Sequence, residues 1–130
     1  MTAIINLTQH AATVEQRAAG VVDLGEEERQ ELGRLLTFET LPGNGEVEAR
    51  AKALAVFAVK ALTSRGLRRV GSPAMIGGAP FLMVHLHCQL ADKRIKPLYA
   101  FSVRESVETT LPDGSVRKTA IFKHGGFVEV

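Results

Sequence analysis

Two patterns of apolar residues follow one another along this chain, and they predict strands and helices in turn. Short apolar runs predict strands at residues 3–7, 21–24, 74–76 and 97–103. Apolar residues at helical spacing predict helices at 26–36, 46–64 and 80–94, and the capping-box spacing of Thr13 and Gln16 predicts a short helix at 14–18. Strands and helices that alternate in this way favour a mainly parallel sheet.

The last quarter of the chain predicts a β-hairpin. Residues 104–110 and 116–122 flank Asp113-Gly114, which is a strong turn signal between β-rich segments. Gly125-Gly126 then precedes a last short strand at 127–130. We therefore predict a single domain over residues 1–130 with an α/β fold. The expected architecture is a Rossmann-like three-layer sandwich, with helices on both faces of a mainly parallel sheet and an antiparallel hairpin at its C-terminal end.

The stretch Gly77-Gly78-Ala79-Pro80 predicts a turn between a strand and a helix. Proline suits the first helical turn, because its φ is already set and its missing N–H is not needed there. The glycines allow a tight turn and a close approach of the backbone to a ligand. Free N–H groups at such a helix start attract anions, phosphate above all. The alternative is a tight turn that binds nothing.

The candidate site lies at the carboxyl ends of the strands. In an open α/β sheet, ligands bind beyond these ends, where the strand order reverses. The strands at 3–7 and 74–76 share one crevice if they are neighbours, and the end of the strand at 97–103 adds further polar groups. The candidate ligand-binding residues are Thr8, Gln9, Gly77, Gly78, Ala79, Ser102 and Ser106, and the candidate catalytic residues are His10 and Arg104.

The two candidate catalytic residues suit a phosphate-containing ligand. The guanidinium of Arg104 clamps a phosphate, and the imidazole of His10 donates a hydrogen bond or acts as a general acid near neutral pH. Each residue also has a simpler interpretation: His10 caps the helix that follows, and Arg104 pairs with Glu105 on the surface.

The helix at 80–94 is apolar nearly all round, which predicts that it is buried on more than one side. In a chain this small, we expect a homodimer with this helix near the interface. His85 and His87 point nearly opposite ways on a helix, since two residues turn it by about 200°. We therefore predict no metal site here.

Composition narrows the classes of function. Hydrophobic residues make up 45% of the chain and charged residues 23%, as in ordinary globular proteins. The net charge is +2 with scattered lysines and arginines, so we expect no binding of double-stranded DNA. The longest apolar run, Ala53–Val59, is too short to span a bilayer, and no signal-peptide pattern is present, so we expect a cytoplasmic protein. Gly77-Gly78 lacks the rest of a dinucleotide or P-loop motif, so we predict no cofactor.

The N-terminal motif suggests a family. Residues 6–13, Asn-Leu-Thr-Gln-His-Ala-Ala-Thr, followed by Glu15-Gln16, resemble the opening of small stand-alone CRISPR-associated proteins with a Rossmann-like, nucleotide-sensing fold. The resemblance implies a symmetric dimer that binds cyclic oligoadenylate in antiviral defence, and a metal-independent phosphodiesterase (ring nuclease) reaction. The resemblance covers the strand at residues 3–7 well and the turn at Gly77-Gly78 loosely, and the positions carried over from it are Thr8, Gln9 and His10.

A second hypothesis needs no ligand. The chain is then a non-enzymatic protein of a phage or mobile element, the turn at residues 77–79 is structural, and the edge of the hairpin recruits a partner chain.

Overall fold

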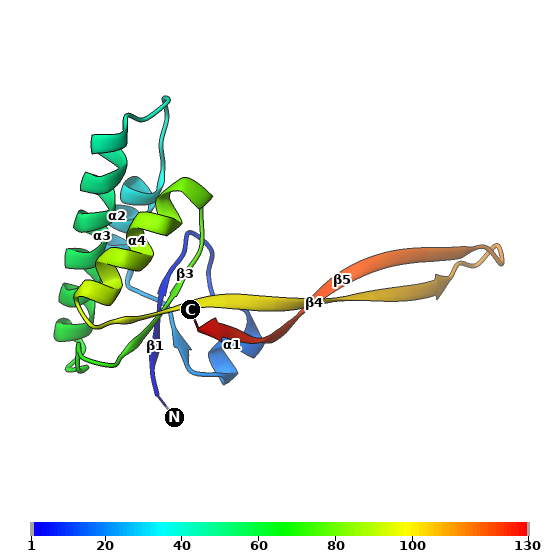
Figure 1. Cartoon of the computed structure of the whole chain (residues 1–130). Helices are drawn as coiled ribbons and strands as arrows, with labels where there is room; N and C mark the ends of the chain where they lie inside the picture. Colours follow the sequence, from blue (N-terminus) through cyan, green and yellow to red (C-terminus); the bar gives the residue numbers. More distant parts are fainter. Residues whose placement is uncertain (1, 130) are drawn as a thin grey trace.

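The computed structural model describes residues 2–129, which form an α/β fold around one five-stranded sheet (Figure 1). The strands are β1 (Ile4–Leu7), β2 (Val21–Val22), β3 (Pro73–Ile76), β4 (Lys96–Thr110) and β5 (Val116–Glu129). The helices are α1 (Val14–Ala18), α2 (Glu26–Leu36), α3 (Asn44–Ser64) and α4 (Pro80–Asp92). The sheet order is β2-β1-β3-β4-β5, with parallel pairing as far as β4 and antiparallel pairing of β5 with β4. The predicted α/β class, mainly parallel sheet and antiparallel hairpin are confirmed.

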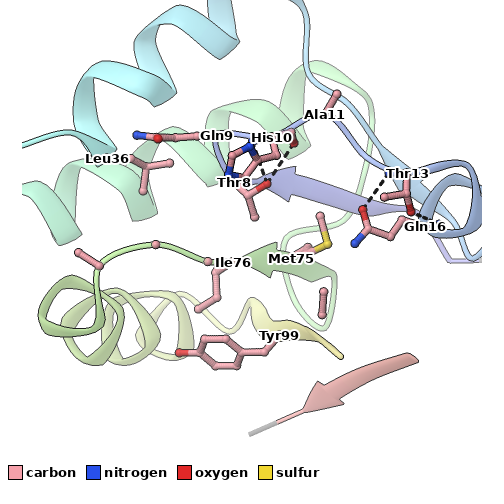
Figure 2. Close-up of a pocket in the computed structure, with 14 residues that line it drawn as sticks. Thr8, Gln9, His10, Ala11, Thr13, Gln16, Leu36, Met75, Ile76 and Tyr99 are labelled. Carbon is pink, nitrogen blue, oxygen red and sulfur yellow. Dashed lines mark hydrogen bonds between the residues drawn. The ribbon is translucent and has the colours of Figure 1, made fainter. Parts of the chain in front are cut away.

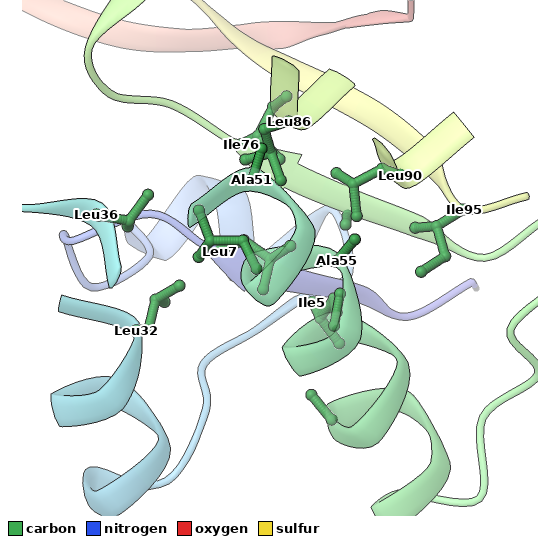
Figure 3. Close-up of a cluster of buried hydrophobic side chains, with 14 of the residues drawn as sticks. Ile5, Leu7, Leu32, Leu36, Ala51, Ala55, Ile76, Leu86, Leu90 and Ile95 are labelled. Atoms are coloured by element: carbon green, nitrogen blue, oxygen red, sulfur yellow. The ribbon is translucent and has the colours of Figure 1, made fainter. Parts of the chain in front are cut away.

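The two faces of the sheet carry different cores. Side chains alternate between faces along a strand, so Ile5 and Leu7 join one cluster while Ile4 joins another. The larger cluster lies between the sheet and the helices α2, α3 and α4 (Figure 3). The smaller cluster combines Ile4 with Ala12, Val21, Met75 and Leu98, and Phe127 of β5 packs against it. One face thus carries the three long helices, and short α1 lies beside β2 and β5.

Beyond the body of the sheet, β4 and β5 continue as a two-stranded ribbon, which we call the arm (residues 101–124; Figure 1). The last residue of β3, Ile76, pairs with Tyr99, so further along β4 its pairing partner is β5. The side chains of residues 101–123 are all exposed. At the tip, Gly114 adopts a positive φ of 88°, and Asp113 accepts hydrogen bonds from the backbone N–H and the hydroxyl of Ser115. The predicted Asp-Gly turn is therefore confirmed.

A β-bulge marks the base of the arm. Phe101 pairs with Gly126 and Ser102 pairs with His124, which leaves Gly125 as an extra residue in β5. A Cβ on Gly125 would lie 2.9 Å from side-chain atoms of both Phe101 and Val103, so the close packing there requires glycine. The extra residue also brings His124 and Phe127 to the same face, although they are three residues apart, and their rings lie 4.8 Å apart.

The largest errors in the predicted boundaries are in β4 and β5. The strand expected to end at residue 103 runs on to Thr110, because its edge groups find partners in β5. The separate last strand expected after Gly125-Gly126 is the end of β5 itself. The glycine pair forms a bulge inside a continuous strand instead of a break between two strands.

Candidate functional site

The crevice expected between two strand ends is present. β1 and β3 are neighbours in parallel register, with Leu7 opposite Ile76. The chain segments that follow them, residues 8–10 and 77–79, therefore leave the sheet side by side. Together they line a cleft of about 460 Å³, which is within the usual size range of small-molecule sites. The structure thus brings Thr8, Gln9, His10, Gly77, Gly78 and Ala79 together (Figure 2).

The cleft has a polar wall and an apolar wall. Thr8, Gln9 and His10 form the first, and Thr13 and Gln16 of the α1 capping box extend it (Figure 2). Ile76 and Tyr99 lie across from them, and burial raises the pKa of the Tyr99 hydroxyl. Among the residues that line the cleft, His10 and Tyr99 are the titratable ones, and no lysine or arginine is present. The remaining lining residues are Ala11, Leu36, Met75 and Ala100.

The turn at residues 77–79 approaches the β1 loop closely. A Cβ on Gly77 would lie 3.5 Å from the methyl carbon of Thr8, so this side of the cleft is formed by bare backbone. Gly78 has a φ of 152°, which side-chain-bearing residues rarely adopt. Ala79 is the N-cap of α4 and Pro80 its first residue, as the sequence predicted.

Buried Asn6 organises the polar wall, and sequence reasoning missed it. Asn6 is 4% exposed, and among residues 2–129 it is the one polar residue that is buried. Its amide donates to the carbonyl of His10 at 2.8 Å and to Asp23 at 2.9 Å. Its amide oxygen accepts from the backbone N–H of Thr8 at 2.9 Å and from the Thr8 hydroxyl at 2.7 Å. One side chain thus fixes both ends of the Thr8–His10 loop. A lone polar residue inside an apolar run at a strand end was the signal that could have identified it.

Asp23, which directly follows β2, supports the same loop. Its carboxylate accepts hydrogen bonds from the Asn6 amide and the Ala12 N–H, and Arg17 forms an ion pair with it at 3.0 Å. Burial alone would raise the pKa of Asp23, but the hydrogen bonds from Asn6, Ala12 and Arg17 outweigh it, so the pKa lies below the ordinary value of 3.8. The charged form of Asp23 is therefore the one that the folded loop stabilises.

The lowered pKa of Asp23 predicts a pH dependence of stability. A carboxyl with a depressed folded-state pKa contributes stability above its unfolded pKa, and this contribution is lost as the pH falls through the folded value. We expect Asp23→Asn to be less stable than the unchanged chain above about pH 4, with the difference shrinking as the pH falls below 3.8. Urea denaturation between pH 2.5 and 7 measures it. A difference that stays constant over this range would contradict the role of the carboxylate.

The structure does not bring the third group of predicted residues to the cleft. Ser102, Arg104 and Ser106 lie on the arm, with exposed side chains, and none of them lines the cleft. The expectation failed because it placed the end of β4 near Val103. Arg104 also does not pair with Glu105, whose carboxylate lies 3.2 Å from the ammonium of Lys123.

One face of helix α4 is buried by its own chain, and the other apolar side chains of the helix are exposed. Leu82, Leu86 and Leu90 are fully buried in the larger core, where α4 packs against α3. Phe81 and Val84 remain 49% and 66% exposed. A homodimer through this helix stays a prediction. A second hollow, of about 540 Å³, lies between α4 and Tyr99 and shares Tyr99 and Gly78 with the cleft.

Within residues 2–129, none of the helices has the length and apolar character needed to span a membrane.

Comparison with known proteins gives a family but no activity. Searches of curated proteins and of solved structures returned no match. A family model described as the uncharacterised protein MJ1673 family matches residues 2–128, which is nearly the whole chain. The chain therefore belongs to the uncharacterised MJ1673 family.

Proposed function

We propose that this protein binds a small ligand of the nucleotide class in the cleft between the loops at residues 8–10 and 77–79. The observation that carries the proposal is the meeting of these two loops beyond neighbouring parallel strands. Ligands of α/β sheets bind at this place in the topology. In this proposal the fold is a Rossmann-like sandwich in which the helical layer around α1 is reduced.

The two walls of the cleft suit the two halves of such a ligand. The apolar wall at Ile76 and Tyr99 offers surface for a base, and the polar wall offers hydroxyl, amide and imidazole groups. Gly77 and Gly78 line the cleft and have no side chains, so a phosphate can approach their main-chain N–H groups closely. Because no lysine or arginine lines the cleft, we propose a ligand with few charges in contact with the protein, bound with a weak dependence on salt.

His10 is the residue to which we assign any proton transfer. Its side chain is exposed at the polar wall, and its backbone is held by Asn6. Arg104 lies on the arm, so the pairing of His10 with Arg104 on one phosphate has no support within a single chain. Binding is thus the function we propose. Cleavage of a cyclic oligoadenylate, which the N-terminal resemblance implies, is tested through His10 alone.

Calorimetric titration with AMP, cyclic AMP and cyclic oligoadenylates tests the proposal. We expect binding to at least one of them, and Gly77→Leu should weaken it at least tenfold, because its side chain fills the space beside Thr8. Gly45→Leu is the matched control, since a Cβ at Gly45 has no atom within 4 Å. Product analysis with His10→Ala then separates binding from cleavage. A folded protein that binds none of these ligands at millimolar concentration contradicts the proposal.

A further inference from the structure

The arm has two long edges that the described chain leaves unpaired. β4 loses its β3 partner after Tyr99, and the other edge of β5 has no neighbouring strand among residues 2–129. Both edges therefore expose backbone N–H and C=O groups that can template another strand. An isolated two-stranded hairpin is also marginally stable in water. The arm thus has both the geometry for edge pairing and an energetic reason for it.

The two edges differ in charge. On β5, the charged arm residues are Arg117, Lys118 and Lys123, which are all basic. On β4, they are Arg104, Glu105 and Glu108, which are of both signs. A strand of like charges repels its own copy, whereas a strand with opposite charges at matching distances from a centre attracts it. The β4 edge is therefore the one that fits a second copy of this chain.

Symmetry fixes how two β4 strands can pair. A two-fold axis makes a strand antiparallel to its own copy, and residues opposed in an antiparallel pair lie on the same face. The axis must therefore pass between one residue of β4 and the same residue of the second copy. Centring it on Arg104 or Glu105 opposes like charges. Centring it on Ser106 places Arg104 opposite Glu108 of the partner subunit, twice in each dimer, and Ser106 opposite its own copy.

We propose that this protein forms a two-fold symmetric dimer in which the β4 edges of two arms pair antiparallel about Ser106 and make a four-stranded sheet. Glu108 already lies 3.7 Å from Lys118 of its own chain, so in the dimer it stands between two basic groups. The proposal concerns a different surface from the cleft and does not depend on a ligand.

Apolar side chains on the arm support the same pairing. Val103, Val107 and Ile121 are 44%, 37% and 41% exposed. The register with β5 places them on one face of the ribbon, together with Phe101. In the proposed dimer Val107 lies diagonal to both Val103 and Val107 of the second copy, so two small apolar patches become one.

The charge balance of the arm disfavours nucleic acid as its partner. Four basic residues, Arg104, Arg117, Lys118 and Lys123, accompany three acidic ones, Glu105, Glu108 and Asp113. Both lysines of the arm are also paired, Lys118 with Glu108 and Lys123 with Glu105. A nucleic-acid surface instead concentrates unpaired basic groups. A self-complementary protein surface is what remains.

Charge reversal tests the proposed register. Arg104→Glu leaves two acidic residues at positions 104 and 108, and Glu108→Arg leaves two basic ones. We expect light scattering to give twice the chain mass of 14.0 kDa for the unchanged protein, the mass of one chain for each variant alone, and a restored dimer when the two variants are mixed. Circular dichroism checks that each variant is folded. A monomeric unchanged protein at 100 μM, or variants that dimerise alone as well as mixed, overturns the proposal.

Cysteine crosslinking tests the position of the axis. Opposed residues in antiparallel strands have Cα atoms about 4.5–5.5 Å apart, within the range that a disulfide spans. In a Cys88→Ser background, Ser106→Cys should crosslink nearly completely under mild oxidation. Ala120→Cys is the matched control, because Ala120 pairs with Ser106 within one chain but lies about 14 Å from its copy across three strand spacings. Crosslinking of Ala120→Cys in preference to Ser106→Cys would assign the interface to β5 and overturn the proposal.

Discussion

We expect Leu86→Ala to lower the free energy of unfolding by about 2–5 kcal/mol. Leu86 is fully buried on α4 and belongs to the core between the helices and the sheet. The substitution removes its contacts and leaves a cavity that the surrounding helices cannot close completely. Urea denaturation at neutral pH measures the change. An effect below about 1 kcal/mol would mean that α4 is not anchored as described.

Val84→Ala is the matched control on the same helix. Val84 is 66% exposed, so its loss should change the free energy of unfolding by no more than about 0.5 kcal/mol. The variant also tests the dimer predicted through α4. If that interface exists, Val84→Ala changes the dimerisation constant while leaving the stability of the single chain almost unchanged. If the dimer forms through the arm, the constant stays the same.

The second large effect is expected at Asn6. Replacing it with leucine keeps the number and branching of the side-chain heavy atoms and removes the hydrogen bonds to Thr8, His10 and Asp23. Each polar group left without a hydrogen-bond partner lowers the free energy of unfolding by about 1–3 kcal/mol where water cannot replace the partner. We therefore expect Asn6→Leu to lower the free energy of unfolding by about 2–3 kcal/mol in total. We also expect weaker ligand binding, since both ends of the loop at residues 8–10 are released.

Gln9→Leu separates the buried network from the exposed loop surface. Gln9 is exposed and makes a hydrogen bond to the hydroxyl of Thr37, so its loss should cost at most about 0.5 kcal/mol. Equal losses of stability for Asn6→Leu and Gln9→Leu would show that Asn6 has no special part in holding the loop.

The sequence was sufficient where local chemistry decides the structure. Apolar runs located β1 and β3, and glycine followed by proline located the start of α4. With these elements, a general rule of α/β topology placed the loops at residues 8–10 and 77–79 in one cleft. The rule works because parallel strands end on the same edge of the sheet.

The sequence was insufficient where long-range pairing decides. Apolar and polar residues are mixed along the arm, and neither of its faces is buried, so the sequence pattern does not reveal where β4 leaves the body of the sheet. For this reason the sequence did not reveal that Arg104 lies on the arm and away from the cleft. Asp23 was read as part of a short strand, because its partner Asn6 is 17 residues away and nothing local to Asp23 indicates the contact.

The bulge at Gly125 has a consequence for how the arm can vary in length. Side chains on β5 beyond the bulge are out of phase with those before it, and the extra residue sets this phase for the entire ribbon. Loss of that single residue would move the side chains of β5, from the bulge to the tip, to the opposite face of the ribbon. We therefore expect homologous chains to lengthen or shorten the arm by the same number of residues in β4 and β5 near the tip. We also expect them to keep the one extra residue of β5 at the base of the arm.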